Sequence, residues 1–261
     1  MHIDTATASA DAAQPETVAL FISDLHLHAA MPKTTAAFFA FLRDRATRAR
    51  QLYLLGDLFE YWAGDDDIDA PYNRQVADAI RAVSDAGVAV FWICGNRDFL
   101  VGARFAAEAG VTPLSDPFVA TIAGQRIVLA HGDAQCTDDV AYIEFRNQVR
   151  DSGWQQAFLA QPLAQRKKII EGARVESRAA QRGKPAEIMD VNETAIGALF
   201  DASDAAIMIH GHTHRPARHD YGTRQRYVLP DWDCDADAPR GGWIAIDADG
   251  AIRAHRMDAA E

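Results

Sequence analysis

The chain has 261 residues, of which 49% are hydrophobic and 24% are charged, proportions that are ordinary for a globular protein with a large core. Its 26 basic and 37 acidic residues give a formal net charge of −11. That charge argues against nucleic acid as a partner, because phosphate backbones require a basic surface. No apolar run is long enough to cross a bilayer, and residues 1–16 lack the basic and apolar regions of a signal peptide. We expect these residues to form a disordered tail.

The first part of the chain alternates short apolar runs with helical stretches. Strands are expected at 18–22, 52–55 and 88–93. One intervening helix carries Phe38, Phe39 and Leu42, and another runs around 73–86. This β-α-β-α-β order predicts a parallel sheet with helices on both faces.

The second part of the chain has a different pattern, beginning at about Val119. Hairpins are expected at 121–127 and at the turns Tyr221-Gly222 and Asp249-Gly250. A long helical segment from about Asp138 to Phe200 separates the first of these hairpins from the others. We therefore expect one α/β (α+β) domain over residues 17–261, with a helical insertion at about 138–200 that forms a lid.

Candidate metal ligands fall just after expected strands, in five short sequences: Asp24-Leu25-His26, Gly56-Asp57, Gly95-Asn96-Arg97-Asp98, His131-Gly132 and Gly211-His212-Thr213-His214. In open α/β sheets, sites form beyond the carboxyl ends of strands, so these segments are expected to share one crevice. Side chains two apart on an extended backbone point the same way, which would pair Asp24 with His26 and His212 with His214. Carboxylate, imidazole and amide ligands without a thiolate suit Mn²⁺, Fe or Zn²⁺.

Taken singly, each of these sequences is as typical of an ordinary loop as of a ligand pair, but their ordered set resembles the calcineurin-like metallophosphoesterases. The resemblance runs from Leu20 to about Arg256. It implies a β-sandwich of two mixed sheets flanked by helices, with Asp57 bridging two metal ions. Asp24, His26 and His214 would complete one metal site, and Asn96, His131 and His212 the other.

Two cations roughly 3.5–4 Å apart lower the pKa of a water molecule and neutralise charge on a phosphoryl group. We expect Asp57, Asn96, Arg97 and His131 to be catalytic. The planar guanidinium of Arg97 suits two-point contact with a phosphate, and the alternative is a surface salt bridge with Asp98.

A narrower resemblance extends beyond the ligands. Residues 20–27, 56–62, 95–99, 131–139, 188–192 and 210–216 are similar to the UDP-2,3-diacylglucosamine diphosphatases of lipid A biosynthesis. That family implies two Mn²⁺ per chain and cleavage of the pyrophosphate to UMP and 2,3-diacylglucosamine 1-phosphate. It also implies substrate contacts, for which the matching positions are Asn96, Arg97, Asp139, Ser177, Gln181, Lys184 and His212. The family has Asn where this chain has Gln181, which changes the reach of the amide.

The basic charge of the expected lid indicates which substrate or surface this segment could bind. Between Phe145 and Pro185 there are nine basic and three acidic residues, a net charge of +6. A basic amphipathic helix suits a doubly acylated anionic substrate and the surface of an anionic bilayer. We expect a monomer that binds peripherally to the cytoplasmic face of the inner membrane. The alternative is a helix that packs its apolar stripe on the domain and exposes its charges to solvent.

Two rival functions remain open. One is a calcineurin-like phosphodiesterase for another nucleotide or phosphoester, against which the basic lid argues. The other is a non-catalytic interaction scaffold, which would be expected to have lost ligands, whereas this chain has all seven.

Overall fold

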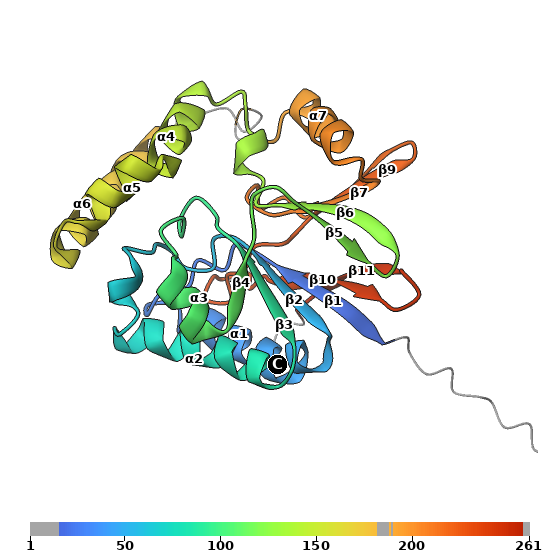
Figure 1. The fold of residues 1–261 in the computed structure, drawn as a ribbon, viewed down its shortest axis with the longest axis horizontal. Helices are drawn as coiled ribbons and strands as arrows, with labels where there is room; N and C mark the ends of the chain where they lie inside the picture. The colour runs from blue at the N-terminus through green and yellow to red at the C-terminus, as the bar shows by residue number, and fades with distance from the viewer. Residues whose placement is uncertain (1–15, 182–187, 189, 258–261) are drawn as a thin grey trace, which may run out of the picture.

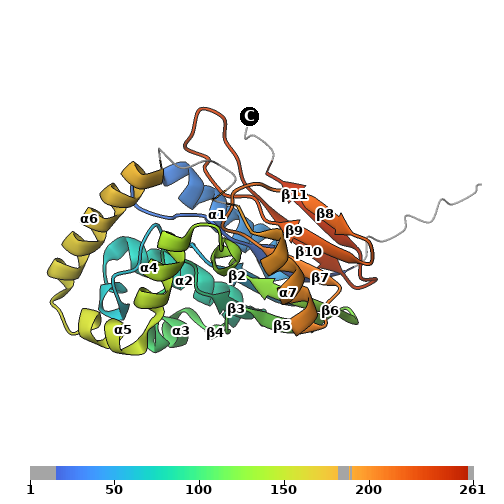
Figure 2. The same ribbon diagram turned by 90° about the horizontal axis from the view of Figure 1, so that it is seen from above.

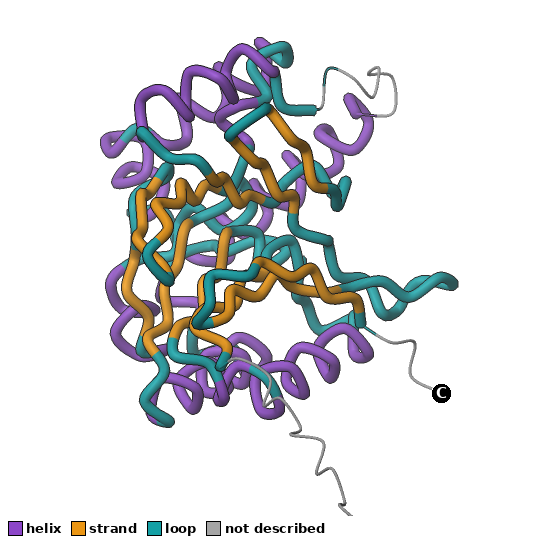
Figure 3. Tube along the Cα trace, turned by 90° about the vertical axis from the view of Figure 1, so that its right-hand side faces the viewer, coloured by secondary structure: helices purple, strands orange, loops and turns teal. Residues whose placement is uncertain are grey.

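Two mixed β-sheets lie face to face in the computed structural model, with helices on their outer sides (Figure 1, Figure 3). The structure describes residues 16–181, 188 and 190–257. The six-stranded sheet contains, in spatial order, β11 (Ile252–Arg256), β10 (Gly242–Asp247), β1 (Thr17–Ile22), β2 (Gln51–Leu55), β3 (Ala89–Ile93) and β4 (Val111–Pro113). The five-stranded sheet contains β5 (Phe118–Ile122), β6 (Gln125–Ala130), β7 (Ile207–His210), β9 (Arg224–Val228) and β8 (Arg218–Tyr221).

The parallel strands of the first part of the chain and the hairpins of the second part match the expectation, whereas the parallel pairing of β6, β7 and β9 was not predicted. Strands β1 to β4 are parallel, and so are β6, β7 and β9. The three expected hairpins are the antiparallel pairs β5–β6, β8–β9 and β10–β11. The predicted sandwich of two mixed sheets is therefore confirmed.

The six-stranded sheet is buried on both faces, which explains its continuous apolar runs. Phe21 of β1 faces the other sheet and stacks on Tyr53 of β2, whereas Leu20 and Ile22 face the helices. Three helices cover that outer face: α1 (Pro32–Asp44), α2 (Pro71–Asp85) and α3 (Ala103–Ala109). The prediction of helices on both faces of this sheet is wrong, because the second sheet covers its inner face.

The outer face of the five-stranded sheet is covered by α7 (Glu193–Ser203) (Figure 1). Ile196 and Phe200 of this helix pack against Val128 of β6 and Met208 of β7. The last part of the expected helical segment is thus a layer of the sandwich itself.

Three helices stand apart from the sandwich (Figure 1, Figure 2): α4 (Val140–Arg150), α5 (Ser152–Leu159) and α6 (Leu163–Gln181). We call residues 140–181 the helical arm. Aspartates begin its first two helices, because Asp139 accepts a hydrogen bond from the Tyr142 amide and Asp151 accepts one from the Trp154 amide. Within the described residues, no helix combines the length and the hydropathy that a membrane span requires.

Most basic side chains of the arm that the structure describes bind groups of their own chain. In α6, Arg166 pairs with Asp66, Lys167 lies 2.5 Å from Asp67, and Arg174 pairs with Glu60. In α4, Arg146 and Arg150 point into the sandwich. Much of the +6 charge expected for this segment therefore attaches the arm to acidic loops of the sandwich.

Candidate dinuclear metal centre

The five candidate ligand segments follow β1, β2, β3, β6 and β7, whose carboxyl ends meet at one rim of the sandwich. Backbone hydrogen bonds join the loops to one another. The amide of Asp24 donates to the carbonyl of Gly56 at 3.0 Å, and the amide of Gly211 donates to the carbonyl of His131 at 2.8 Å. The structure thus brings together residues that lie almost 200 positions apart in the sequence.

The backbone is left-handed at several candidate ligands on this rim, whereas the spacing of the ligand pairs predicted an extended chain. Among the described residues, seven that are not glycine have positive φ, and five of those are candidate ligands: Asp24 (56°), His26 (48°), Asp57 (53°), His212 (69°) and His214 (53°). The extended-chain premise for the two pairs is wrong. These five ligands have left-handed backbone, a conformation that costs free energy in residues other than glycine.

Two glycines allow the loops to touch. A Cβ atom on Gly95 would lie 2.1 Å from Oδ1 of Asp57, and one on Gly56 would lie 2.5 Å from Nδ1 of His131. No side chain fits at either position, so the loops after β2 and β3 can approach closely only with glycine there.

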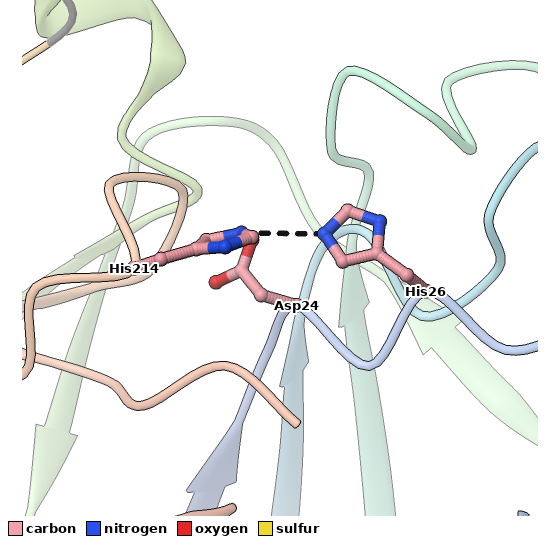
Figure 4. A group of neighbouring side chains, drawn as sticks. All are labelled: Asp24, His26 and His214. Carbon is pink, nitrogen blue, oxygen red and sulfur yellow. Dashed lines mark hydrogen bonds and ion pairs between the residues drawn. The ribbon is translucent and has the colours of Figure 1, made fainter. Parts of the chain in front are cut away.

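Asp24, His26 and His214 form the first ligand group (Figure 4). The two imidazoles face each other with 3.3 Å between their Nε2 atoms, and Nε2 of His214 lies 3.5 Å from Oδ1 of Asp24. Asp24 is fully buried, and its Oδ1 has no hydrogen-bond partner among the described residues. A buried carboxylate oxygen without a donor, beside two converging imidazole nitrogens, fits a divalent cation.

The charge state of Asp24 agrees with this arrangement. Burial raises its pKa, but the imidazole of His214 beside Oδ1 and the charge of His131 outweigh burial and hold the pKa well below its usual range. The side chain is therefore an ionised carboxylate at neutral pH.

Asn96, His131 and His212 form a second group around one oxygen atom. Oδ1 of Asn96 lies 3.0 Å from Nε2 of His131 and 3.0 Å from Nδ1 of His212. Nδ1 of His131 lies 2.9 Å from the carbonyl oxygen of Leu55 and donates to it, so Nε2 is the ring nitrogen that faces the other ligands.

Asp57 lies between the two groups and faces both. Its Oδ1 is 3.7 Å from Nε2 of His131, and its Oδ2 is 4.0 Å from Nε2 of His26. The amide of Arg97 donates to Oδ1 at 2.7 Å and fixes the orientation of the carboxylate. Asp57 is thus placed to contribute one oxygen to each group.

A cavity of about 820 Å³ extends from these ligands to the space beneath the helical arm. Its polar end is formed by His26, Asp57, Asn96, Arg97 and His212, with Asp139 also in the wall. Its other end is apolar and is lined by Trp62, Phe99, Leu100, Phe145, Val149, Trp154, Phe158, Ile169 and Ile170. The cavity therefore changes from charged to apolar along its length.

Comparisons with known proteins agree with this geometry. Residues 18–216 match the model of the family described as calcineurin-like phosphoesterases. The chain belongs to this family. It is 50% identical to a UDP-2,3-diacylglucosamine hydrolase of Aromatoleum aromaticum, over 84% of this chain and 90% of that one. Proteins of the same name from Ralstonia nicotianae and Escherichia coli are each 46% identical, covering 92% and 88% of this chain and 92% and 95% of theirs.

This calcineurin-like phosphoesterase has further carboxylates at the rim that the sequence argument did not assign. Asp98 is buried, and it accepts hydrogen bonds from the amides of Leu58 at 2.9 Å and Gly95 at 2.7 Å. It therefore clamps the β2 and β3 loops together, and the salt bridge with Arg97 that was considered as an alternative is not found among the described residues. Burial, followed by the charge of Asp57, raises its pKa to about 6. Glu60 lies beside His26, and Asp231 lies beside His214.

Three expected substrate-contact positions have no described side chain. Ser177 and Gln181 belong to the last turns of α6, where the side chains lie outside the described part of the structure. Lys184 lies outside the described residues altogether.

Proposed function

We propose that this chain hydrolyses the pyrophosphate of UDP-2,3-diacylglucosamine to UMP and 2,3-diacylglucosamine 1-phosphate, within lipid A biosynthesis. The observation that carries the proposal is the cavity of about 820 Å³, which joins a set of metal ligands to an apolar wall beneath the helical arm. A substrate with a charged pyrophosphate at one end and two acyl chains at the other matches that change in polarity. The name of the relatives supports the same substrate.

The residues fit two divalent cations, and we assign two Mn²⁺ per chain. Asp24, His26 and His214 hold the first position, which we call site 1. Asn96, His131 and His212 hold the second, site 2, and Asp57 is shared. Oxygen and imidazole ligands without a thiolate suit Mn²⁺ as well as Fe or Zn²⁺, and the choice of Mn²⁺ rests on the family resemblance. When bound, the two cations would acidify a water molecule and neutralise negative charge on the phosphoryl oxygens.

We assign catalytic roles to Asp57, Asn96, Arg97 and His131. Arg97 is the clearest case, because its side chain lines the polar end of the cavity and its buried Nε has no hydrogen-bond partner among the described residues. A guanidinium in that state is ready to bind phosphate oxygens at two points. Asn96 directs its oxygen to the two histidines and has an amide nitrogen to donate to substrate.

Substrate contacts are assigned to Asn96, Arg97 and His212 at the polar end of the cavity, and to Asp139 in its wall. The contacts assigned to Ser177, Gln181 and Lys184 rest on the family resemblance alone.

We also propose peripheral binding to the cytoplasmic face of the inner membrane, by a monomer, and exposed apolar side chains on the helical arm support the membrane contact. The large hydrophobic residues exposed on the arm are Val140 (64%), Phe145 (47%), Leu159 (40%), Ile169 (44%) and Val175 (65%). Among the described residues, Tyr221 is the remaining large hydrophobic residue that is exposed. Exposed large apolar side chains mark a contact surface, and we assign that contact to the bilayer.

The test is hydrolysis of the lipid nucleotide compared with bis(p-nitrophenyl) phosphate. We expect kcat/KM for UDP-2,3-diacylglucosamine to exceed that for the aryl diester by at least about 100-fold, because only the lipid fills the apolar end. In ¹⁸O-labelled water the label should enter UMP, since water attacks the phosphorus attached to uridine. Equal rates on both substrates would favour the rival phosphodiesterase, and label in the sugar phosphate would contradict the assigned direction of attack.

A further inference from the structure

Carboxylates lie behind both imidazoles of site 1. Oε2 of Glu60 is 3.2 Å from Nδ1 of His26, and Oδ2 of Asp231 is 3.5 Å from Nδ1 of His214. Each ring therefore has a carboxylate on its Nδ1 side, while the two Nε2 atoms face each other across 3.3 Å. Figure 4 shows these rings meeting from two separate loops above Asp24.

The two imidazoles of site 2 have neutral oxygens beside their Nδ1 atoms. Nδ1 of the buried His131 faces a neutral backbone carbonyl, that of Leu55, at 2.9 Å. His212 turns Nδ1 itself toward Asn96 at 3.0 Å. The nitrogen that faces a carboxylate in both rings of site 1 thus faces a neutral oxygen in both rings of site 2.

Both supporting carboxylates are held by arginines from other parts of the chain. Glu60 pairs with Arg174 of α6, and Oδ2 of Asp231 accepts a hydrogen bond from Nε of Arg240 at 2.6 Å. Asp231 is buried and Glu60 is half-buried, so neither carboxylate is free to turn away from its histidine.

We propose that Glu60 and Asp231 are positioning residues that set the cation affinity of site 1. A carboxylate beside Nδ1 fixes the proton on that nitrogen, orients the ring and makes Nε2 a stronger donor to a metal ion. Such partners typically contribute about 10- to 100-fold to metal affinity. The inference rests on the proposed function, because it assumes that two divalent cations bind at the rim.

The test is a titration of the chelator-treated protein with Mn²⁺, followed by the electron paramagnetic resonance signal of free Mn²⁺. The native chain should bind two ions. In Glu60→Gln and in Asp231→Asn, one ion should bind about 10- to 100-fold more weakly, while the other binds as in the native chain. Glu60→Asp keeps the charge but shortens its reach, so its loss should be smaller than that of Glu60→Gln. Turnover of each variant should recover at saturating Mn²⁺.

Two matched controls separate the carboxylates from the salt bridges that hold them. Arg174→Gln and Arg240→Gln break the pairs with Glu60 and Asp231 but leave both carboxylates in place. Each removes a positive charge near the cations, so we expect Mn²⁺ to bind at least as tightly as in the native chain. If the arginine variants lose as much affinity as the carboxylate variants, the carboxylates merely anchor their loops and the proposal is overturned.

Different results would contradict the dinuclear centre and the positioning role of the two carboxylates. A native chain that binds fewer than two Mn²⁺ would overturn the dinuclear centre itself. A native chain that binds two ions, with unchanged affinities in Glu60→Gln and Asp231→Asn, would overturn the positioning role and leave the dinuclear centre standing. Melting temperatures of the metal-free variants show whether any loss of affinity comes from unfolding.

Discussion

At the rim of the sandwich, Asp24, Asp57 and His131 are buried, and the ligand loops are joined by backbone hydrogen bonds such as that from Gly211 to His131. The helical arm is attached in another way, by side-chain pairs such as Arg166 with Asp66 and Lys167 with Asp67. It also exposes apolar side chains, among them Val140 and Val175.

From this difference we expect the rim to carry out the chemical step and the arm to recognise the substrate or the membrane. Loops fixed by backbone bonds hold ligand atoms in place, which metal catalysis requires. The arm is held by side chains, some of them buried, such as Arg166 and Phe158, and it supplies much of the apolar wall of the cavity. Changes at the rim should therefore affect every substrate, and changes in the arm should affect only the lipid nucleotide or the membrane.

The largest effect is expected at Asp57, which faces both ligand groups. Asp57→Asn should lower turnover of the lipid nucleotide and the aryl diester alike, by at least about 10³-fold, because neither metal position keeps its shared carboxylate. Steady-state kinetics on both substrates measure this. Asp78→Asn, on the exposed face of α2, is the matched control and should leave both rates unchanged.

Removal of metal is the next test of the same region. Dialysis against a chelator should abolish turnover of both substrates, and added Mn²⁺ should restore it. Circular dichroism should show the same helical content throughout, because Asp66 and Asp67, which hold the arm, belong to neither ligand group. Full activity in a chain shown to be free of metal would contradict the two-metal assignment.

A smaller and selective effect is expected in the arm at Phe145, which lines the apolar end of the cavity and is about half exposed. Phe145→Ala should lower kcat/KM for the lipid nucleotide about fivefold to tenfold, through lost apolar contact. The rate on the aryl diester should not change. Leu159→Ala is the control, since Leu159 is similarly exposed but is absent from the cavity wall. Equal losses on both substrates would show that Phe145 supports the rim.

The smallest effect concerns the membrane. Val175 is exposed on α6 and does not line the cavity. Val175→Asp should weaken co-sedimentation with vesicles of phosphatidylethanolamine and phosphatidylglycerol about threefold, without changing hydrolysis of the aryl diester. Unchanged co-sedimentation in this variant and in Val140→Asp would place the bilayer contact elsewhere.

Much of the fold was predictable because both sheets leave local patterns. The parallel strands are buried on two faces and give continuous apolar runs, and the hairpins carry turn residues such as Gly222 and Gly250. The seven candidate ligands stand out because each follows a strand. Their backbone conformation was not predictable from spacing, since Asp-x-His is compatible with an extended chain as well as with a left-handed turn.

The role of charge in the arm was predicted less well, for a physical reason. A count of basic residues between 145 and 185 treats them as one surface, but Arg166 and Lys167 bind aspartates 100 positions earlier. Glu60 and Asp231 were missed for the same reason. Asp231 stands in a stretch with Asp233, Asp235 and Asp237, and only the fold shows which of the four faces a ligand.

The left-handed turns at the rim have a consequence for the stability of the protein. Holding Asp24, His26, Asp57, His212 and His214 at positive φ costs on the order of 1 kcal/mol for each residue, relative to glycine in the same turn. The metal-free chain therefore carries this conformational penalty without the ligand bonds that ion binding would add. A variant such as His26→Gly, though deprived of a ligand, should melt no lower than the native metal-free chain, so that this rim is optimised for geometry at the expense of resistance to heat.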